Sequence, residues 1–138
     1  MIGVLIVTHC QLGEALIEAT ECIIGNKPKS MLFVSIDINE NADKLRKKIA
    51  GGIKSVDQGK GVLILTDMFG GTPSNLSYSF LEEGRVEVIS GVNLPILIKA
   101  ENLQTKNELS KLAKSLEAFG KKSISLASGI LKGNKRGE

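Results

Sequence analysis

The fold is decided by the stretch Leu65-Thr66-Asp67-Met68-Phe69-Gly70-Gly71-Thr72-Pro73-Ser74-Asn75. This stretch continues a short apolar run that begins at Val62, and such a run is typical of a strand buried inside a sheet. Thr72 is predicted to cap the following helix, with Pro73 in its first turn, where the missing N–H of proline is not needed. A strand, a glycine turn and a helix start together direct backbone N–H groups and the positive helix end beyond the strand. The stretch therefore predicts an anion-binding turn.

The composition is that of a single globular domain. The chain has 138 residues, of which 42% are hydrophobic and 24% are charged, and its net charge is +3. This length suffices for one hydrophobic core, so we predict one domain over residues 1–131 and a flexible polar tail over residues 132–138. Aromatic residues make up 4% and tryptophan is absent, which argues against a nucleic-acid-binding surface.

The sequence carries no signal for membrane insertion or secretion. Its apolar runs are far shorter than the roughly 20 residues that a membrane-spanning helix needs. The first residues, Met1–Val4, have neither a basic leader nor a cleavage site. Cys10 and Cys22 are too few for a disulfide framework, and their spacing matches no zinc motif. We therefore expect a cytoplasmic protein that uses no metal and no other cofactor.

Strands and helices are predicted to alternate along the chain. Apolar runs predict strands at residues 2–8, 31–36, 62–66 and 86–90, separated by segments with helical spacing of apolar residues. Alternation at residues 123–127 predicts a further strand at the edge of the sheet. The pattern indicates a doubly wound α/β domain with a mainly parallel sheet of about four strands flanked by helices. In such folds, ligands bind beyond the carboxyl ends of the strands.

Two predicted helices carry features that bear on the surface of the domain. Cys22 lies on the apolar stripe of the helix after the first strand, and we predict that it is a core residue. The helix after the second strand carries a basic cluster, which we interpret as a solvated face, with docking of an acidic partner as the alternative. The cluster comprises Lys44, Arg46, Lys47 and Lys48.

His9 is the sole histidine of the chain, and it lies at the carboxyl end of the first predicted strand. A single histidine excludes a site with two histidine ligands and a relay between two imidazoles. It could be a structural residue, a general base, a metal ligand or a nucleophile. As a general base it would need a placed Ser or Cys, and Cys10 is badly oriented because adjacent side chains on an extended segment point apart. A nucleophilic histidine needs one free ring nitrogen and an acceptor for the proton on the other.

Asp67 can supply that acceptor, because it follows a strand that ends at the same edge of the sheet. As an isolated residue it could equally be a structural cap or a magnesium ligand. The Thr72 hydroxyl and the backbone N–H groups from Gly71 to Ser74 could hold phosphoryl oxygens. This set suffices for phosphoryl transfer, which depends mostly on positioning and electrostatics. Neither G-x-G-x-x-G nor G-x-x-x-x-G-K-[ST] is present, which argues against a nucleotide site.

Three blocks of the sequence resemble the signature blocks of a known family. They are residues 3–9, residues 67–75 and residues 91–95. In their order and spacing they resemble the mannose-family enzyme IIA domain of the phosphoenolpyruvate-dependent sugar phosphotransferase system, over essentially the whole chain. The resemblance implies a doubly wound fold and a homodimer in which the last strand, around Ile124 and Leu126, pairs with the sheet of the partner.

The resemblance also implies roles for individual residues. His9 corresponds to the histidine that accepts a phosphoryl group from the histidine-containing phosphocarrier protein and passes it to enzyme IIB, for uptake of a mannose-, fructose- or sorbose-type sugar. Asp67 corresponds to the acid that orients this histidine, and Thr72 to the hydroxyl residue beside the phosphoryl group. The remaining candidates are the phosphate-binding residues Gly70, Gly71 and Ser74 and a possible rim of Thr8, Cys10 and Asn93.

The chain departs from the family pattern at Cys10, because the family usually has glycine after the active histidine. The cysteine could narrow access, add redox sensitivity or be neutral. A fused enzyme IIB domain is absent from the sequence, so the acceptor is expected to be another protein. The alternative function is a stand-alone regulatory module that phosphorylation of His9 switches. A third possibility, the phosphocarrier subunit of dihydroxyacetone kinase, is disfavoured by the block from Phe69 to Pro73.

Overall fold

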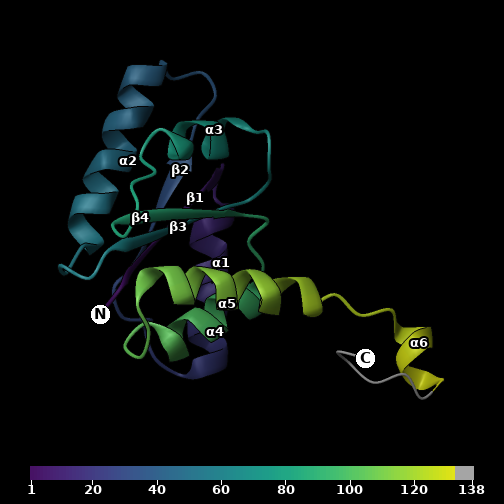
Figure 1. Cartoon of the computed structure of the whole chain (residues 1–138). Coiled ribbons are helices and arrows are strands. Elements are labelled where there is room, and N and C mark those ends of the chain that lie inside the picture. The colour runs from purple at the N-terminus through teal and green to yellow at the C-terminus, as the bar shows by residue number, and fades with distance from the viewer. Residues whose placement is uncertain (133–138) are drawn as a thin grey trace.

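The structure, a computed structural model, describes residues 1–132 as a sheet covered by helices on both faces (Figure 1). Each of the four strands is followed by a helix, as the sequence pattern predicts. In chain order the elements are β1 (Gly3–His9), α1 (Leu12–Ile24), β2 (Met31–Ile36), α2 (Ala42–Val56), β3 (Val62–Thr66), α3 (Thr72–Tyr78), β4 (Val86–Ser90), α4 (Leu94–Leu103), α5 (Leu109–Lys122) and α6 (Ala127–Leu131).

The four strands form one parallel sheet in the order β2-β1-β3-β4. The chain leaves β1 toward one side to form β2 and then crosses to the other side of β1 to form β3. The point at which the strand order reverses therefore lies between β1 and β3. His9 ends β1 and Asp67 directly follows β3, so both lie at this switch point. The predicted doubly wound architecture is confirmed.

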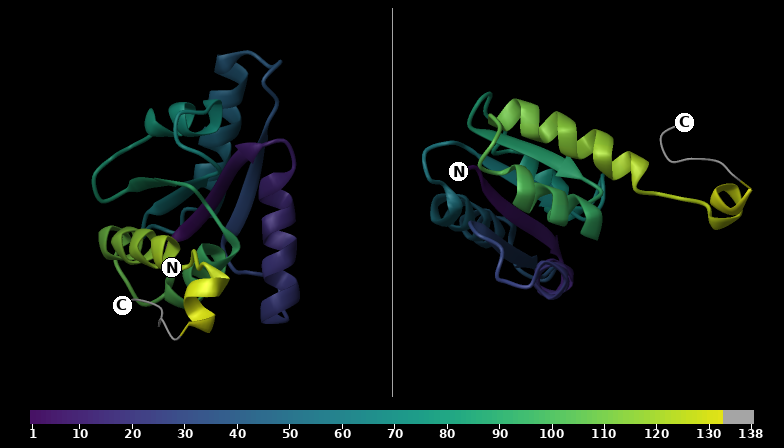
Figure 2. Two further views of the ribbon diagram at one scale, coloured as in Figure 1. Left: turned by 90° about the vertical axis from the view of Figure 1, so that its right-hand side faces the viewer. Right: turned by 90° about the horizontal axis from the view of Figure 1, so that it is seen from below.

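Two apolar cores fill the spaces between the sheet and its helices. α2 and α3 cover one face, while α1, α4 and α5 cover the other, as the perpendicular views show (Figure 2). Strands β1 and β3 are almost entirely buried because helices cover both of their faces. Their side chains alternate between the cores: Val4, Ile6, Leu63 and Leu65 face α1, α4 and α5, and Leu5, Val7, Val62 and Ile64 face α2 and α3.

Helix α3 begins at Thr72 itself, so its cap lies one residue earlier than predicted. Gly71, not Thr72, is the N-cap, and no side chain makes a capping hydrogen bond there. By contrast, the Asn93 side chain caps α4, with its Oδ1 accepting a hydrogen bond from the Ile96 N–H at 2.9 Å. The prediction for Thr72 was wrong because the cap position falls on Gly71, beside the His9 ring, where an added Cβ atom would lie only 3.0 Å from His9 Cε1.

The prediction that Cys22 lies in the core is also wrong, because Cys22 is exposed. The fully buried residues of α1 are Gly13 and Thr20, with Leu16 and Ile17 packed against the core between them. Thr20 is tolerated there because its hydroxyl donates to the Leu16 carbonyl oxygen at 2.8 Å. The buried face of α1 is thus rotated away from the most apolar stripe of its sequence.

The predicted edge strand at residues 123–127 does not form. Residues 124–126 have no regular structure, and the chain continues into the short helix α6. This segment leads away from the body of the domain (Figure 2), so within residues 1–132 it does not lie beside a strand with which it could form a ladder. The tail predicted at 132–138 lies outside the described residues apart from Lys132.

The basic cluster on α2 is exposed, as predicted for a solvated face. Lys44 and Lys48 lie 3.7 Å and 2.6 Å from the carboxylate oxygens of Glu40, and Arg46 lies 3.3 Å from Asp43. Docking of an acidic partner at this cluster stays a prediction. In the part of the chain that the structure describes, the helices are too short or too polar to cross a membrane.

Candidate active site

His9 and Asp67 form a close pair at the switch point of the sheet. His9 Nδ1 lies 2.7 Å from Asp67 Oδ2, which also accepts a hydrogen bond from the His9 backbone N–H at 2.9 Å. The other carboxylate oxygen, Oδ1, accepts the Met68 N–H at 2.9 Å. Both oxygens of Asp67 are thereby held, which fixes the orientation of the carboxylate. Because the carboxylate accepts the Nδ1 proton, the second ring nitrogen, Nε2, keeps a free lone pair.

The electrostatics keep Asp67 ionised at neutral pH. Burial alone would raise its pKa, but hydrogen bonds from the His9 backbone and ring, the charge of that ring and the Met68 N–H outweigh burial, so the pKa of Asp67 lies below its ordinary value. The Asp67 side chain is 11% exposed and that of His9 is 36% exposed. The acid is therefore covered while the ring that it orients remains accessible to a large partner.

Gly71 brings the N-terminus of α3 against the His9 ring. A Cβ atom added to Gly71 would lie 3.0 Å from His9 Cε1 and 3.7 Å from Nε2. The first backbone N–H groups of a helix have no partners within the helix. The start of α3 therefore faces the side of the ring that Asp67 does not occupy. That the glycine turn serves a bound group stays a prediction.

The other predicted phosphate ligands are not equally available. Thr72 is exposed at the first position of α3, and Gly70 adopts a left-handed conformation with φ of 85° in the preceding turn. Ser74, however, is fully buried, and its hydroxyl donates to the Gly71 carbonyl oxygen at 3.0 Å. Its side chain stabilises the first turn of α3, and only its backbone remains a candidate for contact with phosphate.

Two of the three predicted rim residues have structural roles in this arrangement. Thr8 is fully buried, and its Oγ1 accepts a hydrogen bond from the Gly13 N–H at 2.8 Å, which fixes the start of α1. The Asn93 side chain caps α4. Cys10 is exposed directly beside His9, and its φ of 50° lies in the left-handed region. This conformation gives a physical reason for a glycine at this position.

We expect Cys10→Gly to stabilise the domain. A side chain in the left-handed region costs about 1 kcal/mol or more, and glycine removes that cost while adding some entropy to the unfolded chain. The free energy of unfolding, measured by urea denaturation, should rise by roughly 0.5–1 kcal/mol. A Cys10→Ala variant is the matched control, because alanine removes the thiol and keeps the strained backbone. Equal stabilisation by both variants would contradict this explanation.

Three hydroxyl residues near the site form contacts with one another that were not predicted from the sequence. Thr66 Oγ1 donates to Ser90 Oγ at 2.8 Å, and the same Ser90 oxygen lies 2.8 Å from the Tyr78 hydroxyl. The contact between Thr66 and Ser90 could have been inferred, because they are the last residues of two adjacent strands and are paired in the register of these strands. The position of Tyr78 could not be inferred, since it depends on how α3 folds back over β4.

The turn after Asp67 also presents apolar side chains to solvent. Met68 is 54% exposed and Phe69 is 79% exposed. Leu12, just after β1, is 46% exposed. Exposed apolar residues close to an accessible ring are typical of a surface that another protein covers. Among residues 1–132, no group of three or more His, Cys, Asp or Glu side chains is placed to hold a metal ion.

Comparison with known proteins assigns the chain to a family. A family model described as the PTS system fructose IIA component, EIIA-man, matches residues 3–117. The chain belongs to this family. It is therefore a mannose-family EIIA component of sugar phosphotransfer, and it contains the blocks around His9 and Asp67 within the matched region. The resemblance stated from the sequence is confirmed.

Relatives of this EIIA chain cover several sugar systems. It is 33% identical to the PTS system fructose-specific EIIA component of Bacillus subtilis, over 93% of this chain and 88% of the relative. It is also 33% identical to the sorbose-specific EIIA component of Lacticaseibacillus casei, over 84% of this chain and 86% of the relative. With the mannose-specific EIIAB component of Escherichia coli the identity is 33% over 71% of this chain, which spans only 30% of that relative.

Solved structures share the fold. The EIIA component from Streptococcus agalactiae superimposes with a TM-score of 0.82 at 23% identity, covering 93% of this chain and 98% of the other. A mannose/sorbose-specific IIA subunit from Enterococcus faecalis gives a TM-score of 0.80 at 21% identity, covering 91% and 93%. At these identities the match establishes the architecture of this EIIA domain.

Proposed function

We propose that this EIIA domain carries a phosphoryl group on His9. It accepts the group from the histidine-containing phosphocarrier protein and passes it to enzyme IIB during uptake of a mannose-, fructose- or sorbose-type sugar. The observation that carries the proposal is the pairing of His9 Nδ1 with Asp67 Oδ2 at 2.7 Å, which leaves Nε2 free and turned toward the start of α3. We therefore assign Nε2 as the atom that is phosphorylated.

The transfer step is a displacement at phosphorus. The Nε2 lone pair attacks the phosphorus of the donor phosphohistidine, and the Nε2–P bond forms as the N–P bond of the donor breaks. The donor imidazole leaves with the bonding electron pair. The His9 ring keeps its Nδ1 proton, and the Asp67 carboxylate stabilises the positive charge that the ring gains. In the onward step, a histidine of enzyme IIB attacks the same phosphorus and His9 is the leaving group.

The N-terminus of α3 is proposed to hold the phosphoryl oxygens. The backbone N–H groups of Gly71, Thr72 and Ser74 and the Thr72 hydroxyl are the candidate donors, because a Cβ atom added to Gly71 would lie 3.7 Å from His9 Nε2. A helix start favours negative charge. Since phosphoryl transfer is governed by positioning and electrostatics, these donors and Asp67 form a sufficient set without a metal ion.

The proposal is tested by phosphorylating the purified protein. Labelled phosphoenolpyruvate, enzyme I and the phosphocarrier protein should place an acid-labile, base-stable phosphate on the chain, and added enzyme IIB should remove it. Failure to label would refute the carrier function. Labelling without transfer to enzyme IIB from fructose, mannose or sorbose systems would instead support the alternative, a regulatory module switched by His9. A cytoplasmic location stays a prediction that cell fractionation can test.

Asp67→Ala is expected to slow phosphoryl transfer while the domain remains folded. Without the carboxylate, the ring loses its fixed tautomer and the stabilisation of its transient charge, and comparable losses in other enzymes are roughly 100-fold or more. Single-turnover labelling by the phosphorylated phosphocarrier protein measures the rate, and circular dichroism checks the fold. Asp57→Ala is the matched control, because Asp57 is an exposed acid at the far end of α2. An unfolded Asp67→Ala variant would show that this acid is structural.

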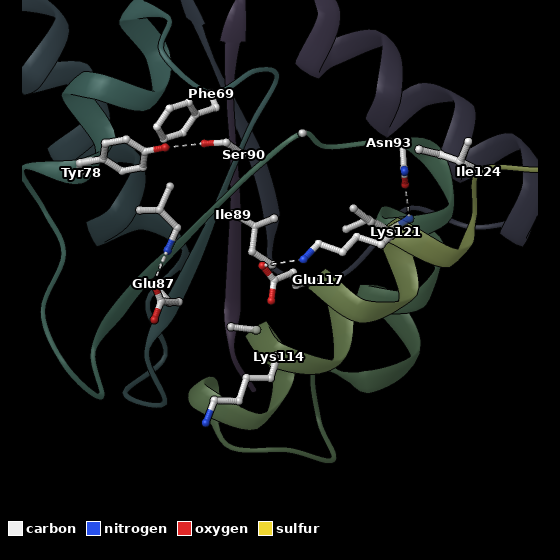
Figure 3. A pocket seen from close by; sticks show the side chains of 15 residues that line it. Phe69, Tyr78, Glu87, Ile89, Ser90, Asn93, Lys114, Glu117, Lys121 and Ile124 are labelled. Atoms are coloured by element: carbon white, nitrogen blue, oxygen red, sulfur yellow. Dashed lines mark hydrogen bonds and ion pairs between the residues drawn. The ribbon is translucent and has the colours of Figure 1, made fainter. Parts of the chain in front are cut away.

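We further propose that two copies of the chain pair along β4. Within residues 1–132, β4 is the last strand of the sheet, and a groove of about 530 Å³ runs beside it, lined by residues of β4 and α5 (Figure 3). In the adjacent C-terminal segment, Ile124 is 83% exposed and Leu126 is 77% exposed. An open strand edge accepts an added strand from another chain. The segment that forms no strand within one chain would then become one on its partner.

Leu126→Asp is expected to convert the protein from a dimer to a monomer. A carboxylate at this position would place a charge in the apolar contact between the copies. Light scattering coupled to size-exclusion chromatography measures the mass in solution. Ile38→Asp is the control, because Ile38 is 70% exposed and lies just after β2, at the opposite edge of the sheet. A wild-type protein that is monomeric at all concentrations would contradict the pairing.

A further inference from the structure

A chain of hydroxyl groups connects three elements that surround the candidate active site. Thr66 Oγ1 donates to Ser90 Oγ at 2.8 Å, and Ser90 Oγ lies 2.8 Å from the Tyr78 hydroxyl. Figure 3 shows the last of these contacts, where Tyr78 reaches across to Ser90 at the end of β4. Thr66 is fully buried, and the other two side chains are partly buried. A buried hydroxyl without a partner is costly, so the contacts are expected to persist.

Each hydroxyl belongs to a different element. Thr66 ends β3 and immediately precedes Asp67, whereas Ser90 ends β4. The carbonyl oxygen of Thr66 also accepts hydrogen bonds from the Gly91 and Val92 N–H groups, at 3.0 Å and 2.9 Å. The residue before Asp67 is therefore fixed to the end of β4 through both its side chain and its backbone.

Tyr78 extends this connection to α3. It is the last residue of α3, whose first turn lies against the His9 ring through Gly71. Its ring also packs against that of Phe69, with the centroids 6.3 Å apart, in the turn that joins Asp67 to α3. The helix has only seven residues, so a displacement at Tyr78 is transmitted to Gly71 within two turns.

The hydroxyl chain thus ties together the two groups that act on opposite sides of the His9 ring. Asp67 holds Nδ1, and the start of α3 faces the side of Nε2. Phosphoryl transfer is sensitive to the relative position of nucleophile and charge-stabilising donors, and an error of 1 Å can cost about 100-fold in rate. A connection that sets the position of α3 relative to Asp67 therefore bears directly on that geometry.

We propose that Tyr78, acting through Ser90 and Thr66, is a positioning residue for phosphoryl transfer at His9. The proposal rests on the proposed phosphorylation of His9, and the hydroxyl chain itself touches neither the ring nor the phosphoryl group. Its role is to hold α3 at a fixed distance from Asp67. Loss of the Tyr78 hydroxyl would leave the ring packing of the tyrosine intact while freeing α3 from the end of β4.

The test compares Tyr78→Phe with Ser79→Ala in single-turnover transfer from the phosphorylated phosphocarrier protein. Ser79 is the residue next to Tyr78, and its hydroxyl donates to the Leu76 carbonyl oxygen. Ser79→Ala therefore removes a hydroxyl that is not connected to Thr66, Ser90 or Tyr78. We expect Tyr78→Phe to lower the maximal transfer rate roughly 3- to 10-fold, as for loss of one hydrogen bond. The concentration of phosphocarrier protein that gives half-maximal rate should stay unchanged, as should both values for Ser79→Ala.

A second pair of variants separates positioning from packing. Thr66→Val keeps the shape of the side chain and removes its donor, whereas Thr66→Ser keeps the donor and removes a methyl group. We expect phosphoryl transfer to be slow in Thr66→Val and to proceed at the wild-type rate in Thr66→Ser. The mass of each variant in solution, measured at the assay concentration, checks that its oligomeric state is unchanged. Wild-type rates for both Tyr78→Phe and Thr66→Val, or equal slowing by Thr66→Ser and Thr66→Val, would overturn the inference. Failure of the wild-type protein to be labelled at His9 would instead refute the proposed function.

Discussion

The His9→Ala variant is expected to acquire no acid-labile phosphate when it is incubated with phosphoenolpyruvate, enzyme I and the phosphocarrier protein. His9 is the sole histidine of the chain, so no second imidazole can take over the nucleophilic role. The fold should survive, because the side chain is 36% exposed and packs against the start of α3 rather than inside either core. Thermal denaturation followed by circular dichroism measures that stability.

The matched control for His9→Ala is Cys10→Gly. It changes the adjacent residue and relaxes the backbone at the end of β1 but leaves the imidazole in place. Labelling at the wild-type level is expected for this variant. Phosphate that survives in folded His9→Ala would mean that another residue is the acceptor, and the carrier function as proposed here would be wrong.

Gly71→Ala is expected to slow transfer by displacing the His9 ring. The backbone of Gly71 has ordinary angles, with φ of −90° and ψ of 169°, so alanine is permitted there by conformation. Its Cβ, however, would approach His9 Cε1 to 3.0 Å and Met68 Cγ to 3.3 Å. The ring or Met68 must then shift by a few tenths of an ångström. Because a misplacement of 1 Å can cost about 100-fold, we expect this shift to slow transfer roughly 3- to 10-fold. Single-turnover labelling measures this loss.

Gly70→Ala distinguishes a clash with the ring from disturbance of the turn. Gly70 has φ of 85° and no atoms within 4 Å of an added Cβ, so alanine there strains the backbone without touching His9. We expect this variant to lose about 1 kcal/mol of stability while retaining most of its transfer rate. If Gly70→Ala transferred as slowly as Gly71→Ala, the conformation of the turn and not contact with the ring would control the reaction.

Most of the fold could be predicted from the sequence because its signals are strong and local. The apolar runs at β1 and β3 are those of strands covered on both faces, and the alternation of strands with helices determines a parallel sheet. That His9 and Asp67 lie close together also follows, since both come at carboxyl ends of strands. The strand order, in which β1 and β3 are neighbours, then brings the two residues together.

The errors have a common physical cause, which is that tertiary contacts overrode local preference. Thr72 is a better cap than glycine in isolation, but the cap position lies beside His9, where a Cβ atom would approach the ring to 3.0 Å. Cys22 is more apolar than Thr20, yet the packing of α1 against the core buries the face with Thr20 and leaves Cys22 exposed. The segment around Ile124 alternates like a strand, but within residues 1–132 no strand lies beside it. Each of these outcomes depends on how distant parts of the chain pack together.

The central claim is that the phosphoryl group is carried on His9 Nε2 while Asp67 keeps the proton on Nδ1. Because the chain has one histidine, selective ¹⁵N labelling gives a single pair of ring nitrogens in the NMR spectrum. Long-range ¹H–¹⁵N spectra recorded before and after phosphorylation identify the modified nitrogen through its change in shift and its coupling to ³¹P. We predict coupling at Nε2, with Nδ1 protonated in both states. Coupling at Nδ1, or a phosphorylated protein whose histidine signals do not change, would contradict the mechanism.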